Sequence, residues 1–150
     1  MPSTDISQYL AYLLASANRR MHHGMTHSIA AEEVTEEHWR ILHVLSDEQG
    51  QSMGELAERV LLNHPALTKN IDKLVSRGLV LRAADTKDNR RVLVYISDLG
   101  LETVARLKIN VDAHHEGITG ALGARKTEQL KRLLESFIES KNVSNDSQNH

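Results

Sequence analysis

The sequence predicts a mostly α-helical protein with a small β-hairpin wing, namely a winged helix-turn-helix domain with additional helices at both chain ends. Three observations predict this fold. Apolar residues recur at helical spacing along most of the chain. After Gly78 the spacing changes to alternation in two short β-rich runs. Basic residues gather between positions 59 and 91, although the net charge of the whole chain is −2.

The composition favours one compact domain and excludes several chemistries. With 150 residues the chain is long enough to bury a hydrophobic core. It has no cysteine, which excludes disulfides, thiolate metal ligands and a cysteine redox switch. The first residues carry no basic targeting region, and no apolar run approaches about 18 residues. We therefore expect a cytoplasmic protein without a membrane segment, in which any contact with a polyanion comes from a local basic surface.

The first half of the chain predicts three helices. The first carries an apolar stripe from Ile6 to Ala17, and we expect it to fray at Gly24. The second begins after Thr35 as N-cap, with the inward residues His38, Ile41, Leu42 and Leu45. The third begins after Ser52 in a capping box with Glu55, and its inward residues are Met53, Leu56, Ala57 and Val60.

A fourth helix and a hairpin complete the expected winged helix. The helix follows Asn63 as N-cap, ends at Gly78, and has the buried stripe Leu67, Ile71, Leu74 and Val75. The β-rich runs at 79–83 and 92–96 are separated by a charged tip, which is typical of a two-stranded hairpin.

Two more helices are expected after the hairpin. Ser97 is the N-cap of a long helix with the inward residues Leu101, Val104, Ala105, Lys108 and Val111. We expect Gly117, Gly120 and Gly123 to break it. The last helix carries the stripe Leu130, Leu133, Leu134, Phe137 and Ile138, and a polar tail at 141–150 is expected to be disordered. Because the first and last helices have no apolar partner within the winged helix, they predict a homodimer built from both chain ends.

The basic segment predicts contact with double-stranded DNA. Between positions 59 and 91 there are eight basic and three acidic residues. Lys69, Lys73 and Arg77 recur every four residues along one side of the fourth helix and are expected to contact DNA, Lys69 and Lys73 through its phosphates. The first turn is stiffened by Pro65 and would face the base edges; the residues expected there are Asn63, His64, Pro65, Ala66 and Thr68. The alternative is a merely solvated helix face, against which the neighbouring short helix and hairpin argue.

The hairpin tip at 85–91 predicts a second DNA contact. Asp85 and Asp88 can accept from turn amides and pair with Arg90 or Arg91, so that one arginine projects outward. Such an arginine suits the narrow, electronegative minor groove, and Lys87 adds to the charge. A salt-bridged turn without a DNA role is the alternative.

Residues 34–100 resemble the MarR family of bacterial winged-helix regulators. The resemblance depends on "MGELAERVLLNHPALTKNIDKLVSRGLVLR" and on the wing "DTKDNRRVLVYISDLG", with Asp88, Arg90, Ser97 and Gly100 at the family's positions. It implies an obligate dimer with intertwined terminal helices, bound to pseudo-palindromic operators. It also implies that residues 63–73 enter the major groove and that Arg90 reaches the minor groove. Many members are repressors released by small phenolic or aromatic carboxylate effectors, bound where the dimerisation helices meet the DNA-binding lobe.

An effector site is predicted near the end of the first helix. Arg19 or Arg20 could clamp a carboxylate, and Trp39, Arg40 and His43 could supply an apolar wall and another cation. Surface ion pairs of the arginines with glutamates at 32–37, and an internal ion pair of Arg40, are alternatives. The five predicted effector residues are Arg19, Arg20, Trp39, Arg40 and His43.

No metal site, cofactor or catalytic site is predicted. His23 and His27 have a two-ligand spacing, but nothing completes the site. One branch of the resembled family senses peroxide through a first-helix cysteine, which this chain lacks; where the zinc-sensing branch has a Glu-His pair, this chain has Trp39 and Arg40. Common catalytic motifs are absent. A metal-sensing regulator or a helical interaction adaptor without DNA binding are the alternatives to an effector-responsive regulator.

The predicted domain organisation follows from these assignments. Residues 1–33 form the N-terminal dimerisation helix and linker, 34–98 the winged helix-turn-helix DNA-binding lobe, 99–140 the C-terminal dimerisation helices, and 141–150 the tail.

Overall fold

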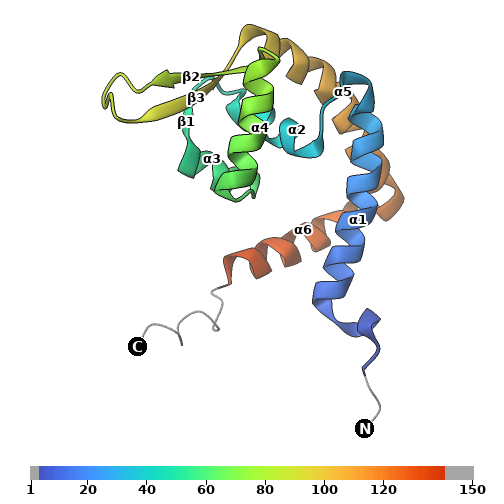
Figure 1. Ribbon diagram of the computed structural model, residues 1–150. Coiled ribbons are helices and arrows are strands. Elements are labelled where there is room, and N and C mark those ends of the chain that lie inside the picture. The colour runs from blue at the N-terminus through green and yellow to red at the C-terminus, as the bar shows by residue number, and fades with distance from the viewer. Residues whose placement is uncertain (1–3, 141–150) are drawn as a thin grey trace, which may run out of the picture. The chain divides into compact units, whose positions relative to one another are not determined.

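The computed structural model describes residues 4–140, which are mostly helical with one small sheet (Figure 1). The chain divides into two compact units, one ending at His114 and the other beginning at His115. The elements in chain order are η1 (Ile6–Gln8), α1 (Leu10–Ile29), η2 (Ala30–Glu32), α2 (Glu36–Leu45), β1 (Gln51–Ser52), α3 (Met53–Val60), α4 (His64–Ser76), β2 (Val80–Ala84), β3 (Val92–Ile96), α5 (Asp98–Leu122) and α6 (Ala124–Glu139). The predicted tail at 141–150 lies outside the described residues.

A winged helix-turn-helix forms the centre of the first unit. The apolar sides of α2, α3 and α4 make the core, and its fully buried side chains include Ile41, Leu42, Leu45, Leu56, Leu67, Ile71 and Leu74. The sheet is antiparallel in the order β1-β3-β2, with Val80 opposite Ile96 and Ala84 opposite Val92 in the hairpin. The predicted fold class is confirmed.

The strand β1 was not predicted from the sequence. Its two residues, Gln51 and Ser52, pair with Val94 and Leu93 of the wing. Two residues are too few to display alternation, so periodicity gives no signal for them. The pairing fixes the base of the wing against the start of α3.

The predicted N-caps all form hydrogen bonds at helix starts, and each such cap stabilises its helix by about 1 kcal/mol. The backbone N–H from which each cap oxygen accepts lies three residues downstream of the cap. The pairs are Thr35 Oγ1 with His38 (3.1 Å), Ser52 Oγ with Glu55 (3.2 Å), Asn63 Oδ1 with Ala66 (2.9 Å) and Ser97 Oγ with Gly100 (3.0 Å). Local sequence therefore determines where these helices begin.

The prediction that the first helix frays at Gly24 is wrong, because α1 continues to Ile29. One glycine costs a long helix only about 1 kcal/mol. Gly24 instead marks a close approach to α5: a Cβ atom at this position would collide with the His114 ring. The glycine is explained by this packing and not by a helix end.

The predicted breaks in the long helix are also partly wrong. α5 passes through Gly117 and Gly120, and only Gly123, with φ +90°, separates it from α6. Its inward side is shifted as well: Leu107 is buried, whereas Lys108 and Ala105 are exposed. Burying Leu107 avoids placing a lysine ammonium group in the core.

The two chain ends carry large apolar side chains that the described chain does not cover. On η1, on α1 and at the cap residue between them, these are Ile6, Tyr9, Leu10, Tyr12, Leu13 and Leu14. On α6 they are Leu130, Leu133, Phe137 and Ile138. Leu134 of the predicted stripe is half-buried. Exposed apolar faces of this extent mark an interaction surface.

Candidate nucleic-acid interface

Helix α4 presents one buried and one solvent-facing side. Leu67, Ile71 and Leu74 are fully buried, which orients the helix, and Lys69 and Lys73 are exposed. The first turn, stiffened by Pro65, is also accessible. Of the residues predicted there, Asn63, His64, Pro65 and Thr68 are exposed and Ala66 is half-buried. An exposed helix of this kind can enter the major groove of DNA.

The wing is held in place by interactions at its tip and base. Asp85 Oδ1 accepts from the Lys87 amide (3.0 Å), and Asp88 Oδ1 accepts from the Arg90 amide (3.1 Å). These are the predicted turn hydrogen bonds. At the base, Arg82 Nη2 of β2 donates to Asp72 Oδ1 of α4 (2.5 Å), which links the wing to that helix.

The two arginines at the end of the tip have different surroundings. Arg91 Nη2 donates to Glu55 Oε1 of α3 (2.6 Å), and not to either tip aspartate. The hydrogen bond from the Ser52 amide, followed by that from Arg91, lowers the pKa of the Glu55 carboxyl. Arg90 is exposed, and its guanidinium makes no hydrogen bond or ion pair within residues 4–140. The outward arginine of the wing is therefore Arg90.

Arg77 was predicted to contact DNA, but the structure places it in an intramolecular contact. It is the C-cap residue of α4. Its guanidinium donates to the backbone carbonyls of Glu33 (2.8 Å) and Glu32 (3.1 Å), which precede α2. Its guanidinium is therefore occupied by the protein backbone and is not offered to DNA.

The five predicted effector residues are not brought together. Arg19 and Arg20 line a hollow of about 640 Å³ along the surface of α1, and the other residues lining it are Ser16, His22, His23 and Thr26. Trp39 and His43 lie on α2 with ring centroids 4.9 Å apart, and Trp39 is only 8% exposed. All residues lining the hollow belong to α1, so within the described part of the chain it is open on one side.

Arg40 has the internal role that was weighed as an alternative. Its Nη1 donates to the Val60 carbonyl at the end of α3 (3.1 Å), and its Nη2 lies 3.6 Å from Glu36 Oε1. Glu36 also contacts His22 Nδ1 of α1. Arg40 thus holds α2 against α3, and His22, not Arg19 or Arg20, is the partner of Glu36.

Sequence reasoning missed the ion pair between Glu32 and Arg106 on α5. The Nε–Oε1 distance is 3.0 Å, and the residues are 74 positions apart in the chain. No local spacing signals a contact at that separation.

His38 is a buried titratable residue between α2 and α4. The residue is 5% exposed, Nδ1 accepts from the Thr35 amide at 3.4 Å, and Nε2 has no hydrogen-bond partner within the described chain. Burial, and then the charges of Arg77 and Lys73, lower the pKa of His38 below the ordinary 6.5; Glu37 and Asn70 oppose this only in part. At neutral pH, therefore, His38 is neutral in the folded protein.

We expect acid to destabilise the protein through His38. The unfolded chain binds this proton at a higher pH than the folded chain does. Stability is therefore fully retained above the ordinary pKa and falls as the pH drops from about 6.5 towards the lower pKa of the folded state, with a slope of at most about 1.4 kcal/mol per pH unit. Urea unfolding of the wild type between pH 7.5 and 5.5 measures this loss.

The matched control is His38→Gln. Glutamine does not titrate, and its oxygen can still accept from the Thr35 amide as in an ordinary capping box. The variant should lose less unfolding free energy over the same pH range. Equal losses in the two proteins would contradict the assignment.

The described residues contain neither a metal site nor a membrane-spanning helix. Within residues 4–140 no three His, Asp or Glu side chains come together in an arrangement that could hold a metal ion. No helix in the part of the chain described by the structure is long and apolar enough to cross a bilayer.

The winged helix-turn-helix is similar in sequence to a known family of proteins. The MarR family model matches residues 34–92. The chain is 30% identical over 101 residues to the HTH-type transcriptional regulator FarR of Neisseria gonorrhoeae, covering 67% of this chain and 69% of that protein. The chain belongs to the MarR family. As a MarR-family protein it is a DNA-binding transcriptional regulator with a winged helix, and the relatives it matches are regulators and not enzymes.

Four further comparisons extend over more of the chain. The homoprotocatechuate degradative operon repressor of Escherichia coli is 28% identical over 110 residues, covering 73% of this chain and 74% of that protein. The repressor CouR bound to a 23-mer DNA duplex has a TM-score of 0.84 and 26% identity, covering 93% of this chain and 99% of that one. BpsR of Bordetella bronchiseptica, whose DNA binding is regulated by 6-hydroxynicotinic acid, has a TM-score of 0.86 and 19% identity, covering 93% and 100%. NadR in complex with 4-hydroxyphenylacetate has a TM-score of 0.78 and 24% identity, covering 94% and 100%.

Proposed function

We propose that the protein is a homodimeric repressor that binds a pseudo-palindromic operator through α4 and the wing. A small hydroxylated aromatic acid is proposed to release the repressor from the operator. The observation that carries the proposal is the basic, solvent-facing side of α4 together with the Arg90 guanidinium at the wing tip, which has no hydrogen-bond or ion-pair partner within residues 4–140. It occurs in a chain whose remainder is strongly acidic.

The DNA contacts divide between base edges and phosphates. The first turn of α4, which includes His64 and Thr68, is proposed to meet base edges in the major groove. Lys69 and Lys73 are proposed to hold phosphates, with Lys87 doing so from the wing. Arg90 is proposed to enter the adjacent minor groove.

A homodimer is supported by the apolar side chains left exposed at both chain ends. Covering a side chain such as Leu133 or Phe137 contributes about 1.5–3 kcal/mol. Two-fold symmetry would present two copies of α4 to two successive half-sites of the operator, as winged helix-turn-helix dimers do.

An aromatic acid is supported by the cations of α1 and by the relatives. Arg19 and Arg20 line the hollow on α1, and a guanidinium binds a carboxylate bidentately. The molecules in the relatives' descriptions include 4-hydroxyphenylacetate and 6-hydroxynicotinic acid, both of which combine a hydroxylated ring with a carboxylate. By linkage, such an effector must bind the DNA-free arrangement more tightly than the DNA-bound one.

A binding isotherm on the DNA upstream of the protein's own gene tests the function. It should be measured at two salt concentrations, with and without 4-hydroxyphenylacetate and 6-hydroxynicotinate. We expect tight binding that weakens steeply with salt and that one of the acids relieves about 5- to 150-fold. No binding at low salt would refute DNA recognition, and binding that neither acid weakens would refute an effector of this class.

The Arg20→Ala variant tests whether Arg20 belongs to the effector site. The variant should bind DNA as the wild type does and lose the response to the acid, because the carboxylate clamp is removed. Arg125→Ala, which removes an exposed arginine from α6, is the matched control and should respond normally. A normal response of Arg20→Ala would exclude Arg20 from the site.

A further inference from the structure

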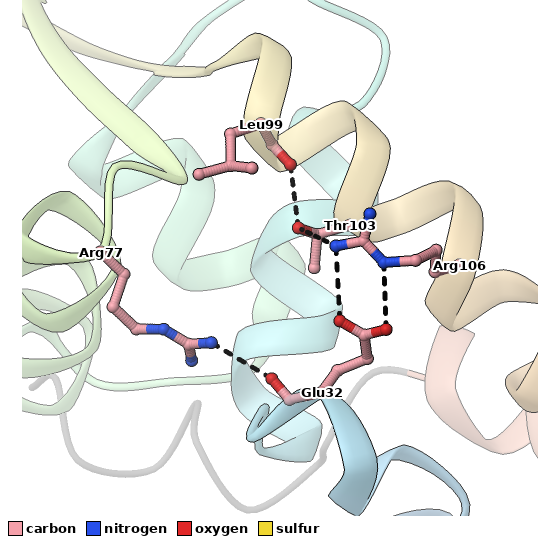
Figure 2. A network of polar contacts seen from close by, with 5 residues as sticks. All are labelled: Glu32, Arg77, Leu99, Thr103 and Arg106. Carbon is pink, nitrogen blue, oxygen red and sulfur yellow. Dashed lines mark hydrogen bonds and ion pairs between the residues drawn. The ribbon is translucent and has the colours of Figure 1, made fainter.

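Three elements of the first unit meet at Glu32, the last residue of η2, and at Glu33, its C-cap residue. Figure 2 shows Arg77 and Arg106 both directed at Glu32. Arg77, the C-cap of α4, donates from Nη1 to the Glu33 carbonyl at 2.8 Å and from Nη2 to the Glu32 carbonyl at 3.1 Å. The end of the proposed DNA-reading helix is thereby fixed to the chain that leaves α1.

The Glu32 side chain extends this contact to α5. Its carboxylate accepts from Arg106 Nε at 3.0 Å and from Arg106 Nη2 at 3.4 Å (Figure 2). Arg106 Nη2 also lies 3.3 Å from Thr103 Oγ1, and that hydroxyl donates to the Leu99 carbonyl at 2.8 Å. One glutamate therefore joins α5 to the backbone segment that holds α4.

The geometry of these contacts holds Arg77 and Arg106 in defined positions, unlike a loose contact between surface side chains. Carbonyls at the end of a helix lack intrahelical partners, and a guanidinium is a rigid fork that can satisfy two of them at once. Glu33 has φ +54°, so the chain turns sharply where these carbonyls lie. The Glu32 side chain is 27% exposed and the Arg106 side chain 52%, and the two hydrogen bonds between them fix the carboxylate and the guanidinium in one orientation.

We propose that Glu32 is a positioning residue for DNA binding, which fixes the C-terminal end of α4 relative to α1 and α5. A displacement of α1 or α5, such as an effector or a partner subunit would cause, would then reach α4 through Glu32 and Arg77. The inference rests on the proposed role of α4 in reading DNA. It assigns Arg77 to this network and not to a phosphate.

The direction in which Glu32→Ala changes the DNA affinity distinguishes a positioning role from a purely electrostatic one. Glu32→Ala removes a negative charge from a DNA-binding protein, and electrostatics alone would then strengthen DNA binding. Loss of positioning weakens it instead. We expect an affinity about 3- to 10-fold below that of the wild type for the DNA upstream of the protein's own gene.

Glu33→Ala is the matched control for Glu32→Ala. It removes the same charge from the adjacent residue, whose side chain makes no hydrogen bond or ion pair within the described chain and whose carbonyl is retained. We expect wild-type or slightly tighter DNA binding. Thermal unfolding of both variants establishes that the comparison is between folded proteins.

Arg106→Gln tests the same contact from α5. It should weaken DNA binding to a similar extent as Glu32→Ala, and the double variant should be no weaker than either single one, because all three lose one shared interaction. Arg77→Gln should also lower the affinity for DNA, while the dependence of that affinity on salt should remain as in the wild type. A fall of about 1 in the slope of log K against log salt would instead identify a phosphate contact and overturn the assignment of Arg77.

Two outcomes are decisive and distinguishable. If the wild type binds DNA and Glu32→Ala binds as tightly as Glu33→Ala, the positioning role is refuted while the proposed function stands. If the wild type does not bind this DNA at low salt, the proposed function fails, and the inference fails with it.

Discussion

Replacing both Leu133 and Phe137 with aspartate should convert the protein into monomers and lower its affinity for the operator by about 100-fold or more. Both side chains are exposed on α6, and burying each contributes about 1.5–3 kcal/mol. Aspartate at these positions would place four uncompensated charges in a symmetric interface. A monomer contacts one half-site only, so it loses the gain from binding two linked half-sites.

Sedimentation equilibrium gives the mass of the double variant, and the DNA isotherm gives its affinity. The matched control replaces Gln129 and Ser136, which are polar and exposed on α6, with aspartate. The control carries the same added charge and should remain a dimer with wild-type affinity. A dimeric Leu133→Asp/Phe137→Asp protein would exclude α6 from the interface.

Arg90→Ala should lower operator affinity by about 10- to 100-fold without changing the mass or the melting temperature. The Arg90 guanidinium has no partner within residues 4–140, so its removal breaks no described contact. An arginine in the narrow minor groove is held by strong negative potential, and a specific contact of this kind is worth about 1–3 kcal/mol. Fluorescence anisotropy on the operator measures the loss.

Arg91→Ala provides the comparison for Arg90→Ala, because the two neighbours differ in their surroundings. Arg91 pairs with Glu55 at 2.6 Å in an exposed ion pair, which solvent screens. The turn hydrogen bonds of Asp85 and Asp88 remain without it. Its loss should weaken DNA binding less than about 5-fold. Stronger weakening by Arg91→Ala than by Arg90→Ala would reverse the roles assigned here.

The predictions from sequence that succeeded depend on short-range interactions. The caps at Thr35, Ser52, Asn63 and Ser97 each bind a backbone amide within three residues, so a local pattern was sufficient. The buried stripes of α2, α3 and α4 follow from the helical period. The basic face of α4 follows from the same period, because the residues that bury the apolar side of a helix also determine which residues face solvent on the opposite side.

The functional site was predicted less completely than the fold. The exposed lysines of α4 and the outward arginine of the wing were both expected. The five effector residues were expected to form one site. In the structure Arg40 donates to the Val60 carbonyl, and the hollow at Arg19 and Arg20 is lined by α1 alone. Which polar partner a long side chain takes depends on its neighbours in space, and one-dimensional spacing carries no information about them.

By itself the sequence determined the order of the elements, the wing and the segregated charge of this protein, because hydrophobic period, capping and turn chemistry are properties of neighbouring residues. Only the tertiary structure decided that α1 passes through Gly24 beside His114, that Gln51 and Ser52 join the wing sheet, and that Arg77 binds backbone carbonyls. It also decided that Glu32 pairs with Arg106 across 74 positions. These contacts join segments far apart in the chain, where close packing and the pairing of polar groups select partners that no local pattern specifies.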